Sequence, residues 1–293
     1  MYFANHQEHQ YPLMQEHVGS FPVSLMCRCL EVSRSGNYRW RGRLPSARTI
    51  RKIRTIEKIR ETFSELKGRY GAPRIACELQ ELGEPCSRNY VAKLMQQEHI
   101  KARNGKGFRY SQPVEGSINI SANLLKRCFD VNRPNCRWTS DITYIWVLER
   151  WLYLAVVMDL YSHRIVGWAF DSQMTDELTR RALKMALERR QIKPGLIVHS
   201  DRGVQYRSQK YQDLLSESKY KPSMSRQANC WDIAAMESFF SRLNVELVYA
   251  GTFESEEQAK SEVFEYIEIF YNRVRRHSAL GYVSPAEYER NYA

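Results

Sequence analysis

The chain lacks the sequence patterns that mark exported, membrane-embedded and zinc-binding proteins. Its 293 residues contain no apolar run of about 18 residues, the length that a membrane-spanning helix needs. The N-terminus has no basic stretch followed by an apolar one, so no signal peptide is indicated. The seven cysteines are odd in number and form no C-x-x-C pair, which argues against a zinc knuckle and a full disulfide framework. We therefore expect a cytoplasmic protein with reduced thiols and no membrane partner.

Acidic residues are scarce in the first part of the chain. Residues 1–130 contain 22 Lys and Arg against 12 Asp and Glu, whereas residues 131–293 contain 22 against 21. Nearly all of the net charge of +11 therefore belongs to the N-terminal part. Such an asymmetry indicates a polyanion as partner, although a solvated basic face that binds nothing specific would look the same.

The N-terminal part has the patterns of short helices. Residues 1–20 are polar and without periodicity, which predicts a mobile leader. Two short helices are expected between Pro22 and Trp40, with Ser33 as the cap of the second. A basic helix follows, because apolar residues recur every three or four positions from Ile50 to Leu66.

The next stretch predicts a helix-turn-helix. Pro73 suits the first turn of a helix that buries Ile75 and Leu79, with Leu82 as a further candidate of the same stripe. Ser87 can cap a second helix that buries Val91, Leu94 and Met95. The second helix carries polar side chains on its other face, which suit phosphates and base edges: Arg88, Asn89, Lys93 and Gln96. A plain helical pair with a wet face remains the alternative.

From about residue 131 the pattern changes to mixed strands and helices. Strands are expected at 139–146, 152–159, 165–170, 195–199 and 221–224, and helices at 176–190, 208–218 and 232–249. Periodicity alone indicates no more than a mixed α/β domain.

Three acidic residues stand in recognisable settings within this domain. Asp141 lies in the predicted strand WTSDITYI, Asp201 follows the strand in IVHSDRG, and Glu237 lies on the helix AAMESFF. Carboxylates are hard oxygen ligands that suit Mg²⁺ or Mn²⁺, and nucleases and polymerases hold two such ions about 3.5–4 Å apart to cut and join phosphodiesters. The trio predicts a metal site for phosphoryl transfer.

The spacing and flanks of these acids resemble a known family. Asp201 and Glu237 have 35 residues between them, the D,D-35-E spacing of retroviral-type integrases and many transposases. Together with WLYLAVVMDLYSHRIVGW, HSDRGVQY and YNRVRRHSALGYVSPAEY, the blocks closely resemble the larger-frame (OrfB-type) transposases of the IS-three family of insertion sequences. The resemblance runs from about residue 20 to the C-terminus.

The resemblance implies an RNase H-like (retroviral integrase-type) catalytic core preceded by an all-α helix-turn-helix DNA-binding region. The domains expected are a leader at 1–20, a helical region at 21–110, a linker at 111–130 and the core with a helical extension at 131–293. The implied enzyme is a DDE-type DNA transposase that binds two Mg²⁺ (or Mn²⁺) ions per active site through Asp141, Asp201 and Glu237. It would nick the ends of an element and join the 3′-hydroxyl to target DNA, without a covalent enzyme intermediate.

The implied partners are double-stranded DNA, namely terminal repeats and target, other copies of the chain assembled on that DNA, and an upstream-frame (OrfA-type) protein or a fusion with it. The resemblance also implies that the protein is located in the bacterial cytoplasm, in association with the nucleoid. Outside the helix-turn-helix, the candidate nucleic-acid-binding residues are basic side chains of the linker, the loops near the acids and the C-terminal block: Arg103, Lys106, Arg202, Arg226, Arg273, Arg275 and Arg276.

Several residues near the acids have two interpretations. His199 shares a strand face with Asp201, and could be a ligand or, more simply, a hydrogen-bonded support for the Asp201 loop. Asp159 could pass for a fourth acid, but a turn or salt-bridge role is the simpler one. Asp232 suits a helix cap.

Two positions depart from the family pattern. Ile233 stands where Asn is usual, and Asn244 where Lys or Arg is usual. Seven residues place Asn244 about 20° from Glu237 around the helix, so we expect it to face DNA and a lysine there to raise strand transfer. These departures leave open a catalytically attenuated copy that acts as a DNA-binding regulator of element ends. A non-specific RNase H-type nuclease fits the acids but not the basic N-terminal helices.

Overall fold

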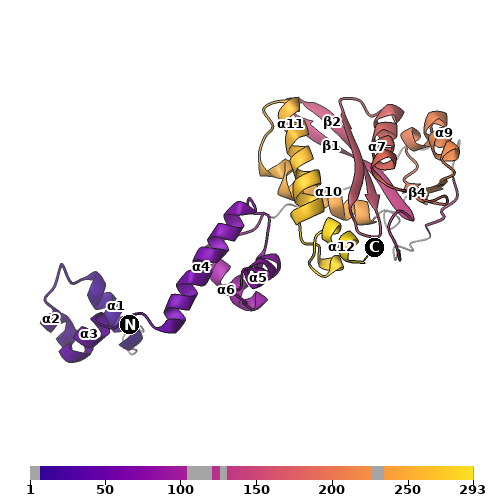
Figure 1. Cartoon of the computed structure of the whole chain (residues 1–293). Coiled ribbons are helices and arrows are strands. Elements are labelled where there is room, and N and C mark those ends of the chain that lie inside the picture. Colours follow the sequence, from indigo (N-terminus) through magenta and orange to yellow (C-terminus); the bar gives the residue numbers. More distant parts are fainter. Residues whose placement is uncertain (1–6, 104–120, 126–130, 226–233, 293) are drawn as a thin grey trace. The chain divides into compact units, whose positions relative to one another are not determined.

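The computed structural model describes residues 7–103, 121–125, 131–225 and 234–292 (Figure 1). The chain forms two compact units, residues 1–61 and residues 62–293. The sequence predicted a separate helical region at 21–110, whereas the compact units divide at residue 61. The predicted helix-turn-helix therefore belongs to the same unit as the α/β domain.

The first unit consists of short helices and the start of a long one. They are α1 (Gln7–Glu16), α2 (Val23–Cys29), α3 (Arg34–Arg41) and the first part of α4 (Ala47–Glu65). The prediction of a mobile leader was wrong for α1, because Met14 is buried against Met26 and Cys27. The prediction of Ser33 as a cap is confirmed, since its Oγ accepts the N–H of Gly36 at 2.9 Å.

The predicted helix-turn-helix is confirmed as α5 (Ala72–Glu81) and α6 (Arg88–Gln97). Ser87 caps α6 by accepting the N–H of Tyr90 at 3.2 Å. The predicted apolar stripe is buried, except for Leu82, which lies at the end of α5 with 58% of its surface exposed. Among the residues that the structure describes, no helix is long and apolar enough to cross a membrane.

The α/β domain is built on a five-stranded sheet in the order β3-β2-β1-β4-β5. All five predicted strands are present: β1 (Arg137–Val147), β2 (Arg150–Asp159), β3 (Ile165–Asp171), β4 (Ile197–Ser200) and β5 (Lys221–Met224). The first three pair antiparallel, and β1, β4 and β5 pair parallel. The remaining elements are α7 (Asp176–Arg189), α8 (Val204–Arg207), α9 (Gln209–Glu217), α10 (Ala234–Glu246), η2 (Val248–Ala250), α11 (Glu256–Phe264), the π-helical η3 (Glu265–Val274), η4 (Ser278–Leu280) and α12 (Pro285–Tyr292).

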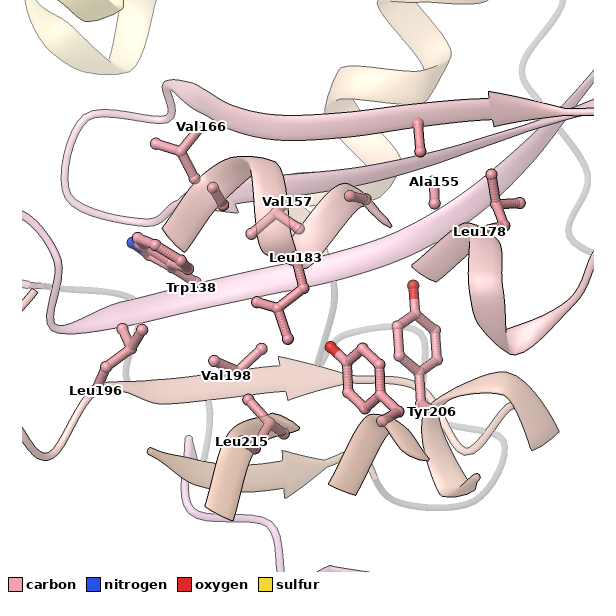
Figure 2. Close-up of a cluster of buried hydrophobic side chains, with 14 of the residues drawn as sticks. Trp138, Ala155, Val157, Val166, Leu178, Leu183, Leu196, Val198, Tyr206 and Leu215 are labelled. Atoms are coloured by element: carbon pink, nitrogen blue, oxygen red, sulfur yellow. The ribbon is translucent and has the colours of Figure 1, made fainter. Parts of the chain in front are cut away.

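Helices cover both faces of the sheet. Successive side chains of a strand point to opposite faces, so neighbouring residues of one strand contact different helices. On β3, Gly167 lies against α7, whereas the indole N–H of the next residue, Trp168, donates to Glu268 of η3 at 2.9 Å. Figure 2 shows the core on the α7 face, where Trp138 and Val157 from the sheet meet Leu183 from α7. This core fixes β1, which carries Asp141, and β4, which Asp201 follows directly.

The C-terminal helix α12 is fastened by a network of charged side chains. Glu289 accepts hydrogen bonds from Arg164, Arg190 and Ser162 at 2.7–2.8 Å. Arg190 also reaches the buried Asp159 at 3.4 Å. The end of the chain is thereby tied to the turn between β2 and β3 and to the end of α7.

We predict that Gly167→Ala lowers the free energy of unfolding by about 3 kcal/mol, through overpacking between β3 and α7. A Cβ there would lie 2.2 Å from the carbonyl oxygen of Ala182 and 2.7 Å from the amide nitrogen of Ala186. Urea denaturation measures the loss. Gly251→Ala is the matched control, since its Cβ would meet nothing within 4 Å, and equal stabilities of the two variants would contradict the close approach.

Candidate active site

The parallel pairing of β1 with β4 brings two of the three acids together. Thr139 pairs with His199, and each of the two acids lies two residues further along its segment. The charge of Asp201 acts on Asp141, so the two acids are neighbours. Asp141 is buried, with 3% of its surface exposed, and its Oδ1 accepts the N–H of Ile142 at 2.8 Å. Its Oδ2 has no hydrogen-bond partner among the described residues. Two carboxylates thus meet at one place on the sheet.

The third acid approaches from a helix. Glu237 lies half-buried in the first turn of α10, which contacts β1. The pKa of Asp141 is raised well above its usual range, first by burial and then by the negative charges of Asp201 and Glu237. Burial also raises the pKa of Asp201 and of Glu237. The charges of Asp201 and Glu237 therefore both act on Asp141, which places the three predicted acids in one neighbourhood.

The donor set fits a divalent cation, which would relieve the repulsion between the carboxylates. Asp141 Oδ2 makes no hydrogen bond in the described part of the chain, so this oxygen is available to bind a cation. Within the described ranges, no three His, Cys, Asp or Glu side chains already form a closed metal-binding group. The acids are neighbours, and binding an ion jointly requires them to draw together.

Two residues that the sequence analysis did not single out shape this site. The hydroxyl of Tyr206 lies 3.0 Å from Ser140 Oγ, and its pKa is raised by burial and by the charges of Asp141 and Asp201. Gly203 donates its N–H to Asp201 Oδ1 at 2.8 Å, and a Cβ on Gly203 would lie 2.9 Å from that oxygen. Both belong to the block HSDRGVQY, so the block was the signal that could have identified them.

The structure places His199 and Asp159 in supporting positions. His199 is fully buried, and its Nδ1 lies 2.8 Å from Ser223 Oγ on the neighbouring strand β5. Asp159 accepts the N–H groups of Asn135 and Tyr161 at 2.8 and 3.0 Å. These contacts favour the support interpretation of His199 and the turn interpretation of Asp159. Asp232 lies outside the described residues.

Family models match most of the chain. The integrase core domain matches at residues 131–230 and, through a second model of the same description, at residues 237–292. An HTH-like domain matches at residues 51–107. These matches show an integrase-type, RNase H-like core and a helical region of the helix-turn-helix kind.

Curated relatives extend over nearly the full length. The chain is 39% identical over 282 residues to transposase InsF for insertion sequence IS3A of Escherichia coli, covering 96% of this chain and 98% of the relative. The chain belongs to the IS-three family of insertion-sequence transposases. This transposase is also 40% identical over 267 residues to an uncharacterized 31 kDa protein of insertion element IS600 from Shigella sonnei, covering 91% of this chain and 98% of that one.

Solved structures include more distant matches to the transposase. The catalytic core domain of HTLV-2 integrase in complex with magnesium is 16% identical, with a TM-score of 0.42, and the match covers 54% of this chain and 97% of that one. A simian T-cell lymphotropic virus intasome chain is 13% identical, with a TM-score of 0.46, and the match covers 73% and 70%.

The polar side chains predicted on α6 of the transposase lie free of its core. The structure exposes all four, namely Arg88, Asn89, Lys93 and Gln96. Arg273 is exposed as well, whereas Lys106 and Arg226 lie outside the described residues. Arg202 is half-buried and donates through Nε to the carbonyl oxygen of Ser225 at 2.8 Å.

The expectation that the C-terminal arginines grip DNA needs correction for two of them. Arg275 is buried, and its Nη2 lies 2.8 Å from Glu246, which also accepts the hydroxyl of Tyr266 at 2.9 Å. Arg276 pairs with Glu78 and Glu81 of α5 at 2.6 and 2.5 Å. Their charges are thus neutralised inside the protein. The sequence block YNRVRRH could not reveal these acids, because they lie far away along the chain.

Further contacts join the helix-turn-helix to the C-terminal segment. The hydroxyl of Tyr70 accepts the N–H of Arg276 at 2.8 Å, and Arg74 donates to the carbonyl oxygen of Arg276 at 2.8 Å. Arg103 donates through Nη1 to the carbonyl oxygen of Glu246 at 2.8 Å. Arg74 and Arg103 thus bind backbone carbonyl groups of the transposase itself.

The structure also corrects the expectation for Asn244. This residue is buried, with 3% of its surface exposed, so it does not face a DNA duplex. The helical angle between Glu237 and Asn244 was reasonable, but Asn244 shares its side of the helix with Phe240 and Leu247, which are buried as well. This side of α10 is half-buried at Glu237, in the first turn, and fully buried at Asn244, two turns later.

We predict that Asn244→Lys destabilises the transposase by at least about 2 kcal/mol, because it buries an ammonium group. Strand transfer should not rise. Ser238→Lys, on the exposed side of the same helix, is the matched control for thermal or urea unfolding. A fully stable Asn244→Lys protein with raised strand transfer would restore the original expectation.

Proposed function

We propose that Asp141, Asp201 and Glu237 form the DDE triad of this transposase and hold two Mg²⁺ or Mn²⁺ ions. The observation that supports the proposal is the buried Oδ2 of Asp141, which has no hydrogen-bond partner among the described residues. Burial and the charges of the other two acids raise the pKa of the same side chain. A pair of divalent cations would ready a water or a 3′-hydroxyl for attack on phosphorus and stabilise the leaving 3′-oxygen.

The chain's own groups prepare this chemistry by fixing the acids in place. The N–H groups of Ile142 and Gly203 each hold one carboxylate oxygen, of Asp141 and Asp201. The burial of Asp141 keeps water away and strengthens electrostatic interactions. The same site would first nick an element end, with water as the nucleophile, and then join the freed 3′-hydroxyl to target DNA while the target's 3′-oxygen leaves.

We predict that Asp141→Asn, Asp201→Asn and Glu237→Gln each reduce strand cleavage and strand transfer roughly a thousandfold, or about 4 kcal/mol. Each change removes a charge that binds metal and keeps the side-chain shape. The assay measures nicking of a duplex that carries the element end, in Mg²⁺, with and without EDTA.

Duplex binding and thermal stability of the same variants serve as controls. Binding should stay near the native value, and stability should be native or higher, because each change removes a charge from the group of acids. Native-level cleavage by any one of the three variants would remove that residue from the triad. Metal-independent nicking by the native protein would contradict the proposed role of the metal ions.

An attenuated copy that only occupies element ends is the second candidate. It rested on Ile233 and Asn244. Ile233 lies outside the described residues, and Asn244 is buried, so the second no longer suggests a lost DNA contact. We therefore favour an active enzyme. Assembly of several copies on DNA, an upstream-frame partner and work at the bacterial nucleoid remain parts of the proposal.

DNA recognition is assigned in this proposal to the exposed face of α6. We predict that Lys93→Ala weakens binding to all duplexes alike and makes the plot of log affinity against log salt shallower by about 0.9. Arg88→Ala should instead reduce the preference for element ends, by about 1–3 kcal/mol if it contacts a guanine.

Fluorescence anisotropy across a salt series measures both effects. The full chain is the right material, because a fragment ending at residue 130 would leave Glu78 and Glu81 without Arg276. Lys58→Ala, an exposed residue paired with Glu61, is the control. Unchanged affinity, slope and preference in both α6 variants would show that α6 does not contact DNA.

A further inference from the structure

A polar cavity lies at the opposite end of α10 from Glu237. Its volume is about 150 Å³, and it opens between the segment that follows α4 and the stretch that follows α10. The polar and charged side chains that line it are Lys67, Arg69, Arg103, Thr252, Glu262 and Glu265. None of them belongs to the acidic triad. We call it the Arg69 pocket.

Arg69 is the most deeply placed of these side chains, with 7% of its surface exposed. Its guanidinium carbon lies 4.3 Å from the ring centre of Phe270 and 5.3 Å from that of Tyr266. The cation lies over both rings, but its Nε–H has no acceptor among the residues described. Burial lowers the pKa of Arg69, which marks a poorly solvated charge. A buried cation with an unused donor attracts an anion.

The other charges around the pocket are already engaged. Lys67 pairs with Glu265 at 2.6 Å, and Glu262 accepts a hydrogen bond from Gln258 at 2.9 Å. Arg103 uses one nitrogen for the carbonyl oxygen of Glu246. The Glu246 carboxylate behind the pocket is bound to Arg275. Three cations therefore line the pocket against two anions, and one positive charge is left over.

We infer that the Arg69 pocket binds a phosphate group. An arginine edge matches the tetrahedral oxyanion, because its N–H groups can donate to two oxygens together. The phosphate can come from the DNA backbone or from a free phosphate in solution. The first source rests on the proposed function, since it places a DNA contact of the transposase beyond both the acids and α6.

The first arm of the test uses inorganic phosphate alone, without Mg²⁺ or DNA. Thermal unfolding of the full chain is followed as phosphate replaces chloride at constant ionic strength. The native protein should show a saturable rise in Tm. Arg69→Gln should lose the rise, and Lys260→Gln, which removes a charge from an exposed pair with Glu256, should keep it.

A gain-of-binding variant protects the test against a variant that fails to fold. Glu262→Gln removes a negative charge from the pocket wall and retains an acceptor for Gln258. It should lower the phosphate concentration at half-saturation several-fold, which a misfolded protein cannot do.

The second arm distinguishes the two sources. Duplex binding is measured across a salt series for the native, Arg69→Gln and Glu262→Gln proteins. If the pocket holds a DNA phosphate, the salt slope of Arg69→Gln becomes shallower by about 0.9, and Glu262→Gln binds more tightly. A phosphate-dependent Tm that Arg69→Gln loses, together with unchanged DNA binding, assigns the pocket to a free phosphate, whereas an equal rise in Arg69→Gln and unchanged DNA binding would overturn the inference.

The inference is overturned if phosphate leaves the Tm of the native and Glu262→Gln proteins unchanged and neither variant alters DNA binding. Because no arm requires strand cleavage, such a result would leave the DDE triad untouched. Conversely, loss of the triad proposal would not alter the phosphate response.

Discussion

The repulsion that Asp201 and Glu237 exert on the buried Asp141 is the constraint that the surrounding α/β domain must meet. Asp141 is held out of water beside Asp201, with Glu237 close enough to raise its pKa. Such an arrangement is unfavourable in isolation. The surrounding fold must therefore hold the acids in place, through the β1–β4 register, the N–H of Gly203 and the packing around Tyr206. A site that is costly when empty is well suited to bind divalent cations.

A second buried charge has the opposite character, because its partner is built in. Glu246 and Arg275 are each almost fully buried, and Tyr266 completes the hydrogen bonding. Replacing either charge alone would leave the other unpaired in a poorly hydrated place. One end of α10 thus carries Glu237, the acid proposed to bind metal, and the other end carries Glu246, which is paired with Arg275 of the same chain.

Local patterns in the sequence predicted the elements well, because each depends on neighbouring residues. Ser87 as a cap, the five strands and the placement of Asp141, Asp201 and Glu237 on a strand, after a strand and on a helix required only periodicity, capping and the family blocks. Burial of individual polar residues could not be predicted in this way. Arg275, Arg276 and Asn244 look like surface residues in a basic block or on a helical face, yet all three are buried. The acids that pair with the two arginines, Glu246 and Glu78, come from distant parts of the chain. The helix α1 was missed for a related reason, since Met14 finds its apolar contacts on α2.

The bonds from Tyr70, Arg74 and Glu78 to the C-terminal segment have a mechanical consequence. They place α5 and α6 in the same compact unit as the acids. Under the proposed roles of α6 and the acids, the fold of this unit would set the distance between the DNA-recognition helix and the cleavage site. That distance would set the number of base pairs between the recognised sequence and the cut, and the DNA would have to bend or twist where the two do not match.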